Sequence, residues 1–344
     1  MQQYILLKKL NVQNANAIAG LTYGFPAITN FLGFAHALSR KLPENLQVTL
    51  GGVAVISHKN NVHVRQPKGW GDYVFALTRN PLTQHGNTAP INEEGRMNMQ
   101  ISLLIEVEGL VAGDQATQQL LQEKIRTSIP TMRLAGGQIT GFESCEVLND
   151  ELAQQKALRR LMPGFVLLDR SDYLEAHFSA LQAKQQNTSM FDAWCDLAKL
   201  KYQATAVENQ AGEIEQIDPP QENAASEESE ESTKIKANWE YVAKPNAGYL
   251  VPIAAGYYAI SELYAAGEVE NVRDKTVPVA FAETAYSVGE WQSVHRLKEI
   301  NNGVWCYTHQ TPWYVAKTAK TTTTILEPDT ESQASDTVFD PDFL

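Results

Sequence analysis

The sequence has little cysteine, and its three cysteines do not occur in pairs. Cys145, Cys195 and Cys306 lie far apart in a chain of 344 residues, without a CxxC spacing. Three such cysteines indicate neither a disulfide framework nor a structural zinc site, so we expect neither. We interpret the three thiols as small buried hydrophobic groups, and we expect no metal and no other cofactor.

Long apolar runs are also absent. The most apolar stretch, residues 249–267, is interrupted by Pro252, Gly256 and Glu262. No run reaches the roughly 18 uncharged apolar residues of a membrane-spanning helix. The N-terminal residues lack the layout of a signal peptide. The sequence therefore predicts an intracellular, cytoplasmic protein without membrane contact.

Basic residues are missing from two acidic segments. Between Lys201 and Lys234 there are nine acidic residues and no basic one, and after Lys320 there are six more acidic residues. When these fifteen are removed from the 40 acidic residues, 25 remain against 28 basic ones, so the net charge of -12 becomes about +3. Charge acts on a partner only within about 8–10 Å at ordinary salt. The overall acidity therefore does not exclude an RNA-binding surface.

Composition divides the chain into four regions. Residues 1–204 alternate strand and helix patterns, and residues 237–320 are rich in aromatic side chains. Residues 205–236 contain almost no large apolar side chains, a Pro-Pro pair and a run of acids, which predicts a disordered linker. Residues 321–344 are predicted to form a disordered acidic tail for the same reason. The fold class that we expect is α+β with a largely antiparallel sheet.

Hydrophobic periodicity predicts the elements of the first region. A strand over residues 4–10 should break where the polar stretch after Leu10 begins, and a helix should follow over residues 28–42. Residues 47–65 read as a hairpin that turns at Lys59 and Asn60, with a bulge at the Gly51-Gly52 pair. The other predicted elements are strands over 72–78, 97–107, near 139 and over 164–169, helices over 115–128 and 151–162, and two helices that end near residue 201.

No catalytic motif stands out. The chain has no GxSxG, Walker or HExxH motif. His36, on the first predicted helix, could act as a general base in RNA cleavage, although a surface histidine is the simpler interpretation. His58 and His63 have no carboxylate or thiol near them in sequence that would complete a metal site. We therefore do not expect an enzyme.

A long polar loop is the first of three segments that suit RNA. It joins two predicted strands with about 17 residues, and such loops often bind ligands because they lack apolar anchors. Arg79, Asn80, His85 and Arg96 lie in this loop or at its ends. The alternative is a surface hairpin without a binding role.

The second segment is the string TMRLAGGQI, which places Arg133 before Gly136 and Gly137. Glycine adopts positive φ readily, so backbone N–H groups in such a loop can approach a phosphate with the arginine alongside. A Gly-Gly pair before a strand is also often only a turn. The sequence leaves both interpretations open.

The third segment is the helix over residues 151–162. Helical spacing places Lys156, Arg159 and Arg160 on one face and leucines on the opposite face. A basic stripe of this kind can follow phosphates, or it can simply be a solvated face.

Eight short strings, in order from residue 10 to residue 296, resemble one known family. The strings are LNVQNANAI, YGFP, LTRNPL, MRLAGG, LMPGF, GYLVPIAAGY, GEVENVRD and GEWQSVHR. Together they resemble the second Csy-type subunit of the type I-F CRISPR surveillance complex (Cascade), in the RAMP superfamily. The resemblance covers most of the chain outside the two acidic segments, which are where this chain differs.

The resemblance implies an RRM-like, ferredoxin-like antiparallel core with a hairpin thumb, a glycine-rich loop and a smaller C-terminal region. It implies a non-catalytic subunit in antiviral defence. With the large subunit and beside the backbone subunits, this subunit would bind the 5′ handle of the CRISPR RNA, and any contact with target DNA would be indirect. The side chains of Asn14 and Asn16 would then hydrogen-bond unstacked bases or 2′-OH groups.

Two alternatives remain open at this point. One is a RAMP-type endoribonuclease that processes CRISPR RNA, with His36 as its only placed base. The other is a pure protein-interaction module, which the aromatic C-terminal region would favour.

Overall fold

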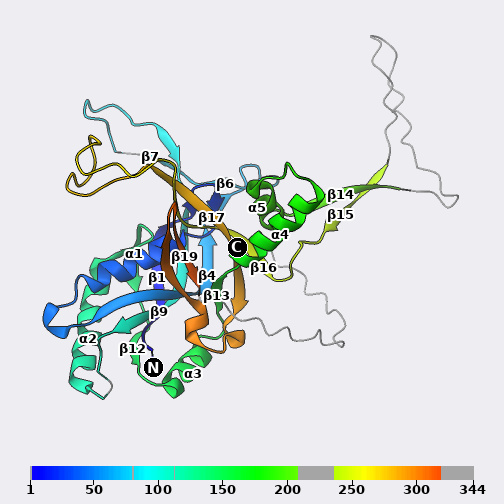
Figure 1. Cartoon of the computed structure of the whole chain (residues 1–344). Coiled ribbons are helices and arrows are strands. Elements are labelled where there is room, and N and C mark those ends of the chain that lie inside the picture. Colours follow the sequence, from blue (N-terminus) through cyan, green and yellow to red (C-terminus); the bar gives the residue numbers. More distant parts are fainter. Residues whose placement is uncertain (1, 80, 112, 208–235, 319–344) are drawn as a thin grey trace, which may run out of the picture. The chain divides into compact units, whose positions relative to one another are not determined.

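The computed structural model describes residues 2–79, 81–111, 113–207 and 236–318. Within these residues the chain is α+β, with five α-helices and one large antiparallel sheet (Figure 1). It divides into two compact units, Met1–Glu175 with Gly248–Leu344, and Ala176–Ala247. The predicted α+β class with an antiparallel sheet is confirmed. No helix among the described residues is long and apolar enough to cross a membrane.

The first unit begins with a β-α-β-β-α-β succession. Its four long strands pair antiparallel in the order β12-β1-β9-β4. The elements are β1 (Gln3–Asn16), α1 (Ile28–Ser39), β4 (Thr49–Val62), β9 (Arg96–Glu108), α2 (Gln115–Ser128) and β12 (Ser144–Leu148).

Short elements connect these strands and helices. The pairs β2 with β3, β5 with β6, β7 with β8 and β10 with β11 are small hairpins or ribbons. Their bounds are β2 (Ile18–Ala19), β3 (Thr22–Tyr23), β5 (Val64–Arg65), β6 (Val74–Phe75), β7 (Leu77–Arg79), β8 (Ile91–Glu93), β10 (Arg133–Leu134) and β11 (Gly137–Gly141). Two 3-10 turns are η1 (Glu44–Leu46) and η2 (Ile129–Thr131).

A ring of six strands extends the sheet beyond β4. One edge of β4 pairs with both β13 and β18, and the pairings β13-β17-β16-β19-β18 return to β4. The buried Trp305 of β18 adds a link to β13, because its indole Nε1 donates to the carbonyl oxygen of Leu167 at 2.8 Å. The additional elements are α3 (Glu151–Arg160), β13 (Phe165–Asp169), β16 (Tyr249–Ala259), β17 (Ala282–Ser293), η3 (Val294–Arg296), η4 (Ile300–Gly303), β18 (Val304–Gln310) and β19 (Trp313–Thr318).

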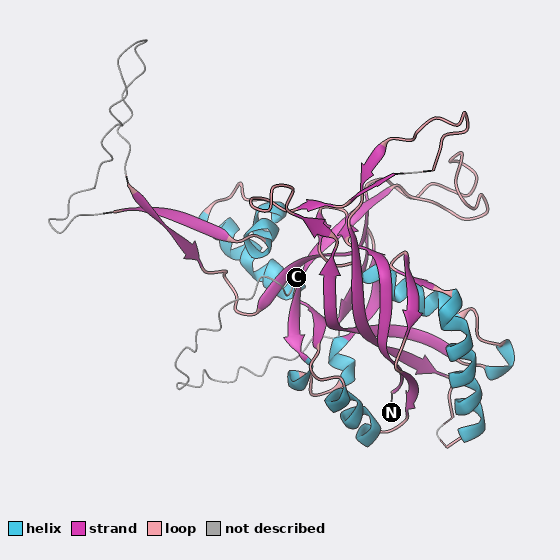
Figure 2. Ribbon diagram, turned by 180° about the vertical axis from the view of Figure 1, so that it is seen from behind, coloured by secondary structure: helices cyan, strands magenta, loops and turns pink. Residues whose placement is uncertain are grey.

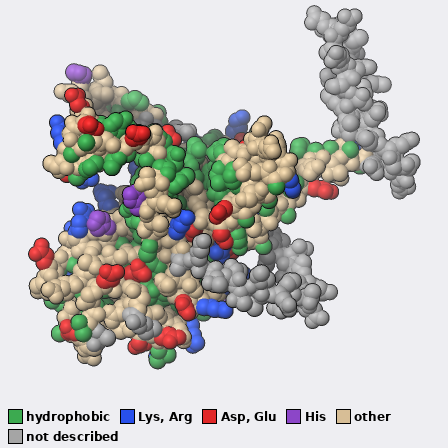
Figure 3. All heavy atoms as spheres, in the orientation of Figure 1, with side chains coloured by type: hydrophobic (Ala, Val, Ile, Leu, Met, Phe, Trp, Pro, Cys, Tyr) green, Lys and Arg blue, Asp and Glu red, His purple; other side chains and the backbone are tan. Residues whose placement is uncertain are grey.

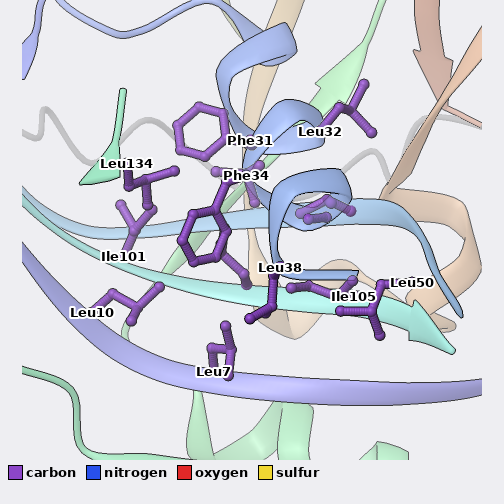
Figure 4. Packing of buried hydrophobic residues seen from close by; sticks show 14 of the residues in the cluster. Leu7, Leu10, Phe31, Leu32, Phe34, Leu38, Leu50, Ile101, Ile105 and Leu134 are labelled. Atoms are coloured by element: carbon purple, nitrogen blue, oxygen red, sulfur yellow. The ribbon is translucent and has the colours of Figure 1, made fainter. Parts of the chain in front are cut away.

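One face of the sheet packs against α1 and α2. The predicted stripe of α1 is buried, and Figure 4 shows Phe31, Phe34 and Leu38 packed over Leu7 and Leu10 of β1. Burial of a side chain of this size contributes about 1.5–3 kcal/mol. Figure 2, which views the molecule from behind, also shows helices along this side of the sheet. This core fixes which side chains of each strand point to the opposite face.

The second unit contains most of α4 (Ser171–Lys184), α5 (Met190–Ala198) and the ribbon of β14 (Lys201–Ala206) and β15 (Ala237–Val242). A capping box of Ser189 and Asp192 begins α5, as helix N-termini require partners for their free N–H groups. Residues 208–235 and 319–344, where the linker and tail predictions fall, lie outside the described residues.

Two strand predictions were wrong. The first strand does not break after Leu10 but continues through the asparagine-rich stretch to Asn16, because β9 and β11 pair with that stretch across two register shifts. The predicted turn at Lys59 and Asn60 does not exist, because β4 runs continuously to Val62 along β9. The register does shift between Leu50 and Val53, so the bulge predicted at the Gly-Gly pair is confirmed.

Candidate nucleic-acid interface

The face of the sheet opposite α1 and α2 has two halves of different character. Over the N-terminal half of β1, apolar residues from α3, β13 and η3 cover it in a second core. Over the C-terminal half no such cover is present among the described residues, and the strands present polar side chains. We call this open half the polar sheet face; its residues are Asn11, Gln13, Lys59, Asn61, Asn98, Gln100 and Gln138.

Strand register places these side chains on one face. Asn11 and Lys59 both lie opposite Gln100, while Asn61 lies opposite Asn98. Their neighbours along the strands, Met97, Met99 and Val12 among them, belong to the core under α1. Side chains alternate between faces along a strand, so the polar residues must point away from that core.

Amide groups on this face are partly paired with one another. Gln100 Nε2 donates to Asn11 Oδ1 at 2.9 Å, and the backbone N–H of Asn14 donates to Asn98 Oδ1 at 3.1 Å. A primary amide has two donors and an acceptor with two lone pairs, so each keeps capacity for another partner. Asn11, Gln13 and Asn61 are exposed. The face therefore presents amide donors and acceptors together with one exposed cation, Lys59.

Two arginines meet at the end of this face. Arg96 begins β9, and its Nε lies 2.9 Å from Glu94 Oε2, with both side chains about one-third exposed at 34%. Arg133 Nη1 donates to the carbonyl oxygen of Gly136 at 3.2 Å. A Cβ built on Gly136 would lie 3.8 Å from Arg96 Nη1, so the glycine turn lies beside the Arg96 guanidinium. The structure thus brings Arg96 beside Arg133 and Gly136, which lie about 40 residues further along the chain.

The glycine turn is a two-residue hairpin. Leu134 pairs with Gly137, and the two residues between them, Ala135 and Gly136, have positive φ of 49° and 75°. This is the pattern of a type I′ turn, whose twist matches the flanking strands. A Cβ at Gly136 would otherwise meet open space.

Gly137 has a different reason to be glycine. A Cβ there would lie 2.7 Å from the backbone nitrogen of Ala15 and 2.7 Å from the carbonyl oxygen of Gln13. The close approach of β11 to β1 therefore accounts for this glycine without a ligand. Only Gly136 retains space beside it for a phosphate.

The two asparagines predicted to bind RNA differ in their surroundings. Asn14 is exposed and has a positive φ of 55°, which asparagine tolerates better than most residues. Asn16 Nδ2 donates to the carbonyl oxygen of Ile18 at 2.6 Å, while its Oδ1 accepts from the Ile18 N–H at 3.1 Å. Asn16 thus shapes the turn into β2, and Asn14 is the freer of the two.

The predicted long loop becomes the segment of residues 63–95, with β5 to β8 paired along it. His85 is exposed at its tip, where the Thr83 N–H donates to the carbonyl oxygen of Asn87 at 2.9 Å. Arg79 ends β7, but its side chain is not described, and Asn80 lies outside the described residues. Arg96 at the end of this segment joins it to the polar sheet face.

The basic helix α3 lies away from this site. Arg160 forms a bidentate pair with Glu146, which holds the pKa of that carboxyl below its usual range, and Arg159 is exposed on the same helix. Because α3 packs on β12, it lies near the start of β1, roughly ten residues or 30 Å along the strand from Asn14. The RNA prediction for these two arginines stays a prediction.

His58 marks the border between the two halves of the face. Its Nδ1 lies 2.9 Å from the carbonyl oxygen of Pro163, and its Nε2 lies 2.7 Å from Ser102 Oγ, which also accepts from the Lys9 N–H at 2.9 Å. A carbonyl can only accept, so Nδ1 carries the proton and the Ser102 hydroxyl donates to Nε2. Burial and the nearby Lys9 lower the pKa of His58, which favours this neutral form.

His36, on which an endoribonuclease would depend, lies elsewhere. It is exposed on α1, which packs on the face of the sheet opposite the polar sheet face. Within the described residues its side chain forms no hydrogen bond or ion pair. No group of three or more His, Cys, Asp or Glu side chains suited to a metal occurs in the described part of the chain.

Sequence reasoning predicted none of the seven residues of the polar sheet face as RNA-binding. A signal was present in RMNMQI, where Arg96, Asn98 and Gln100 alternate with apolar residues at a period of two. The other strands gave no such signal, because bulges in β1 and β4 interrupt the alternation. The cross-strand register was needed to find the full set.

Hydrophobic side chains also gather on the surface of the first unit. Figure 3 shows them over the loop between β16 and β17, where Ile260, Leu263, Val277 and Phe281 are exposed. These exposed apolar side chains are not part of the polar sheet face.

Two comparisons with known proteins give concordant matches. A family model described as CRISPR-associated protein (Cas_Csy2) matches residues 5–315 of the chain. The CRISPR-associated protein Csy2 of Pseudomonas aeruginosa (strain UCBPP-PA14) is 37% identical over 323 residues, which cover 90% of this chain and 92% of that protein. The residues matched by the family model include the polar sheet face and the glycine turn.

Proposed function

The chain belongs to the Csy2 family of CRISPR-associated proteins, and from this membership we propose that it is a non-catalytic subunit of a type I-F surveillance complex. Its proposed role is to bind the 5′ handle of the CRISPR RNA together with the large subunit and beside the backbone subunits. Base pairing by the RNA would then recognise the target, while protein holds the backbone, a division of labour known from another RNA-guided system.

The topology of the first unit supports an RRM-like core. The β-α-β-β-α-β succession and the strand order β12-β1-β9-β4 are those of a ferredoxin-like fold. RRM domains bind RNA on the sheet face that the helices leave open. In this chain α3 and η3 close half of that face, so we place RNA on the open half.

The observation that carries the proposal is the polar sheet face, with Arg96, Arg133 and the Gly136 turn at its end. Amide side chains suit the base edges and 2′-OH groups of unstacked RNA, because they offer donors and acceptors together. Arg96, Arg133 and the Gly136 turn add cations and backbone N–H groups for a phosphate. We assign residues 63–95 as the thumb that folds over this RNA.

Arginine substitutions test the proposal through the salt dependence of binding. Labelled RNA of the CRISPR repeat should bind the purified protein, and Arg96→Ala and Arg133→Ala should each reduce the slope of log K against log salt by about 0.7. Lys124→Ala is the matched control, because Lys124 is an exposed cation on α2, on the other side of the sheet. Equal slopes in the wild type and both test variants would refute the proposed surface.

The same RNA reports on catalysis. We expect the RNA to remain intact after prolonged incubation with the wild type, and His36→Ala to change neither binding nor assembly with the other subunits. Cleavage that His36→Ala abolishes would establish the endoribonuclease alternative instead.

A further inference from the structure

A groove of about 330 Å³ lies between α3 and η3. It is separate from the polar sheet face, because it lies over the half of the sheet that α3 covers. Leu158, Val294 and Leu297 are buried beneath it, and the exposed Met162 borders it. The groove therefore has an apolar floor that reaches the surface.

Cationic side chains line the rim of this groove. Arg159 and Lys298 are both exposed and line it from opposite sides, and within the described residues neither forms an ion pair. His295 also lines it, with its Nδ1 2.7 Å from Ser293 Oγ. The nearest acidic residues on these elements are Glu151, which accepts from Gln155 at 3.1 Å, and Glu299, next to Lys298 in sequence.

An apolar floor with a cationic rim selects a ligand that is apolar and anionic at once. A phosphate backbone would satisfy Arg159 and Lys298 but would leave the apolar floor without a partner. Aromatic or aliphatic side chains that alternate with carboxylates fit both parts, because burial of apolar area and charge-assisted hydrogen bonds then act together.

The chain itself carries a segment of this chemistry. Residues 336–344 read DTVFDPDFL, with Phe339, Phe343 and Leu344 interleaved with Asp340 and Asp342. No basic residue follows Lys320. The larger acidic run over residues 208–232 is a poorer match, because Ile214 and Ile217 are its only large apolar residues.

The segment can reach the groove from the last described strand. Thr318, the last residue of β19, lies at one end of β13, where the Asp169 N–H donates to Thr318 Oγ1 at 3.3 Å. At the other end of β13, Phe165 pairs with Ser293, which precedes the groove residue Val294. Thr318 and the groove are therefore separated by about the length of β13, roughly 15 Å. Residues 319–338 can span up to about 65–70 Å when extended. Length therefore does not prevent binding within one molecule.

We propose that residues 339–344 of this chain bind the groove between α3 and η3. The phenylalanines pack on Leu158 and Leu297, and the two aspartates face Arg159 and Lys298. Binding there covers Arg159, so the tail excludes other anions from this residue. This inference is independent of the RNA site proposed above.

A labelled peptide tests the proposal on the full-length chain. The probe is a fluorescein-labelled peptide of residues 331–344, and the receptor is full-length protein with Phe339→Ser and Phe343→Ser, whose own tail no longer competes. We expect this receptor to bind the peptide at least ten times more tightly than the wild type does. The peptide with both phenylalanines changed to serine should bind at least ten times more weakly.

Charge reversal at the rim then locates the site. In the receptor background, Arg159→Glu with Lys298→Glu should reduce peptide affinity at least tenfold, whereas Lys41→Glu with Lys124→Glu, an equal charge change at exposed positions elsewhere, should not. Equal loss in both pairs would show non-specific attraction and overturn the proposal. Absence of peptide binding would also overturn it. The same holds if the affinity for repeat RNA, and not for the peptide, depends on Arg159 and Lys298.

Discussion

Gly136 and Gly137 are neighbours in sequence but meet different surroundings. The Cβ of Gly137→Ala would lie 2.7 Å from backbone atoms of β1, which cannot rotate away as a side chain can. We expect a loss of unfolding free energy above the about 1–3 kcal/mol of an overpacked side chain. Gly136→Ala meets open space and should cost only the about 1–2 kcal/mol of a left-handed alanine.

Melting temperature and RNA affinity, measured on the same preparations, separate the two roles. Gly137→Ala should melt lower, while its folded fraction binds repeat RNA normally. Gly136→Ala should melt closer to the wild type and bind RNA more weakly if a phosphate sits on the turn. Normal RNA affinity in Gly136→Ala would show that the turn has only a structural role.

His58 should make the protein less stable in mild acid. Its pKa is lowered in the folded state by burial, so the unfolded chain binds a proton first as pH falls through about 6.5. The free energy of unfolding should therefore decline as pH falls from about 6.5 to the folded-state pKa of His58. Below that pKa, His58 should cause no further decline. The slope should stay below the roughly 1.4 kcal/mol per pH unit of one full proton, because the ring is only partly buried.

Urea unfolding at pH 7.5 and 5.5 measures this effect. His58→Gln should lower stability at pH 7.5, since the Ser102 and Pro163 partners lose the ring, and should remove part of the pH dependence. His36→Gln, at an exposed position on α1, is the control and should retain the wild-type dependence. An unchanged pH dependence in His58→Gln would exclude this histidine as its source.

At the scale of elements, the tip of the thumb contributes little to the fold. Residues 82–88 are exposed, and their backbone hydrogen bonds within the described residues are local ones around Thr83. Replacing this tip with a short Asn-Gly turn should leave the melting temperature within about 2 °C of the wild type. It should weaken RNA binding if the thumb folds over the RNA.

Shortening a second exposed loop provides the control for the thumb. Residues 265–277, between β16 and β17, are also largely exposed, and the exposed Leu263 and Phe281 flank them in sequence. Their removal should leave RNA affinity unchanged. If both deletions weakened RNA binding equally, the loss of affinity would not be specific to the thumb.

At the scale of the whole molecule, the acidic segments offset the basic surface. Deleting residues 208–232 removes nine acidic residues and no basic one, so the net charge should change from -12 to -3. We expect faster association with RNA at low salt, because long-range repulsion falls, and convergence with the wild type at high salt. The melting temperature should stay the same, since the segment has few apolar side chains to bury.

Stopped-flow association rates across a salt series check this prediction. A shorter linker of glycine and serine in place of residues 208–232 keeps the β14-β15 ribbon connected between Ala206 and Ala237. Equal rates at low salt would show that the charge of this segment does not slow association with RNA. A large drop in melting temperature would show that the segment packs on the folded body.

Local signals predicted much of the fold. The helix over residues 115–128 matches α2, and the apolar stripe of α1 is buried as its spacing indicated. The charge and apolar pattern of α3 also holds, with Leu158 buried and Arg159 exposed. These patterns depend on residues within one or two turns, so the sequence contains all the information they need.

Long-range pairing decided the rest. Asn11 to Asn16 lack a local strand signal, yet they are strand because β9 and β11 supply hydrogen-bond partners from 80 or more residues away. The same pairing brings Arg96 beside the Gly136 turn and separates both from α3.

The sequence by itself determined the composition of the site: which segments carry arginines, amides and glycines, and which carry only acids. Only the tertiary structure decided which of these residues share a surface. The reason is that a one-residue bulge moves every later side chain of a strand to the other face, and the bulges of β1 and β4 follow from their partners rather than from their own residues.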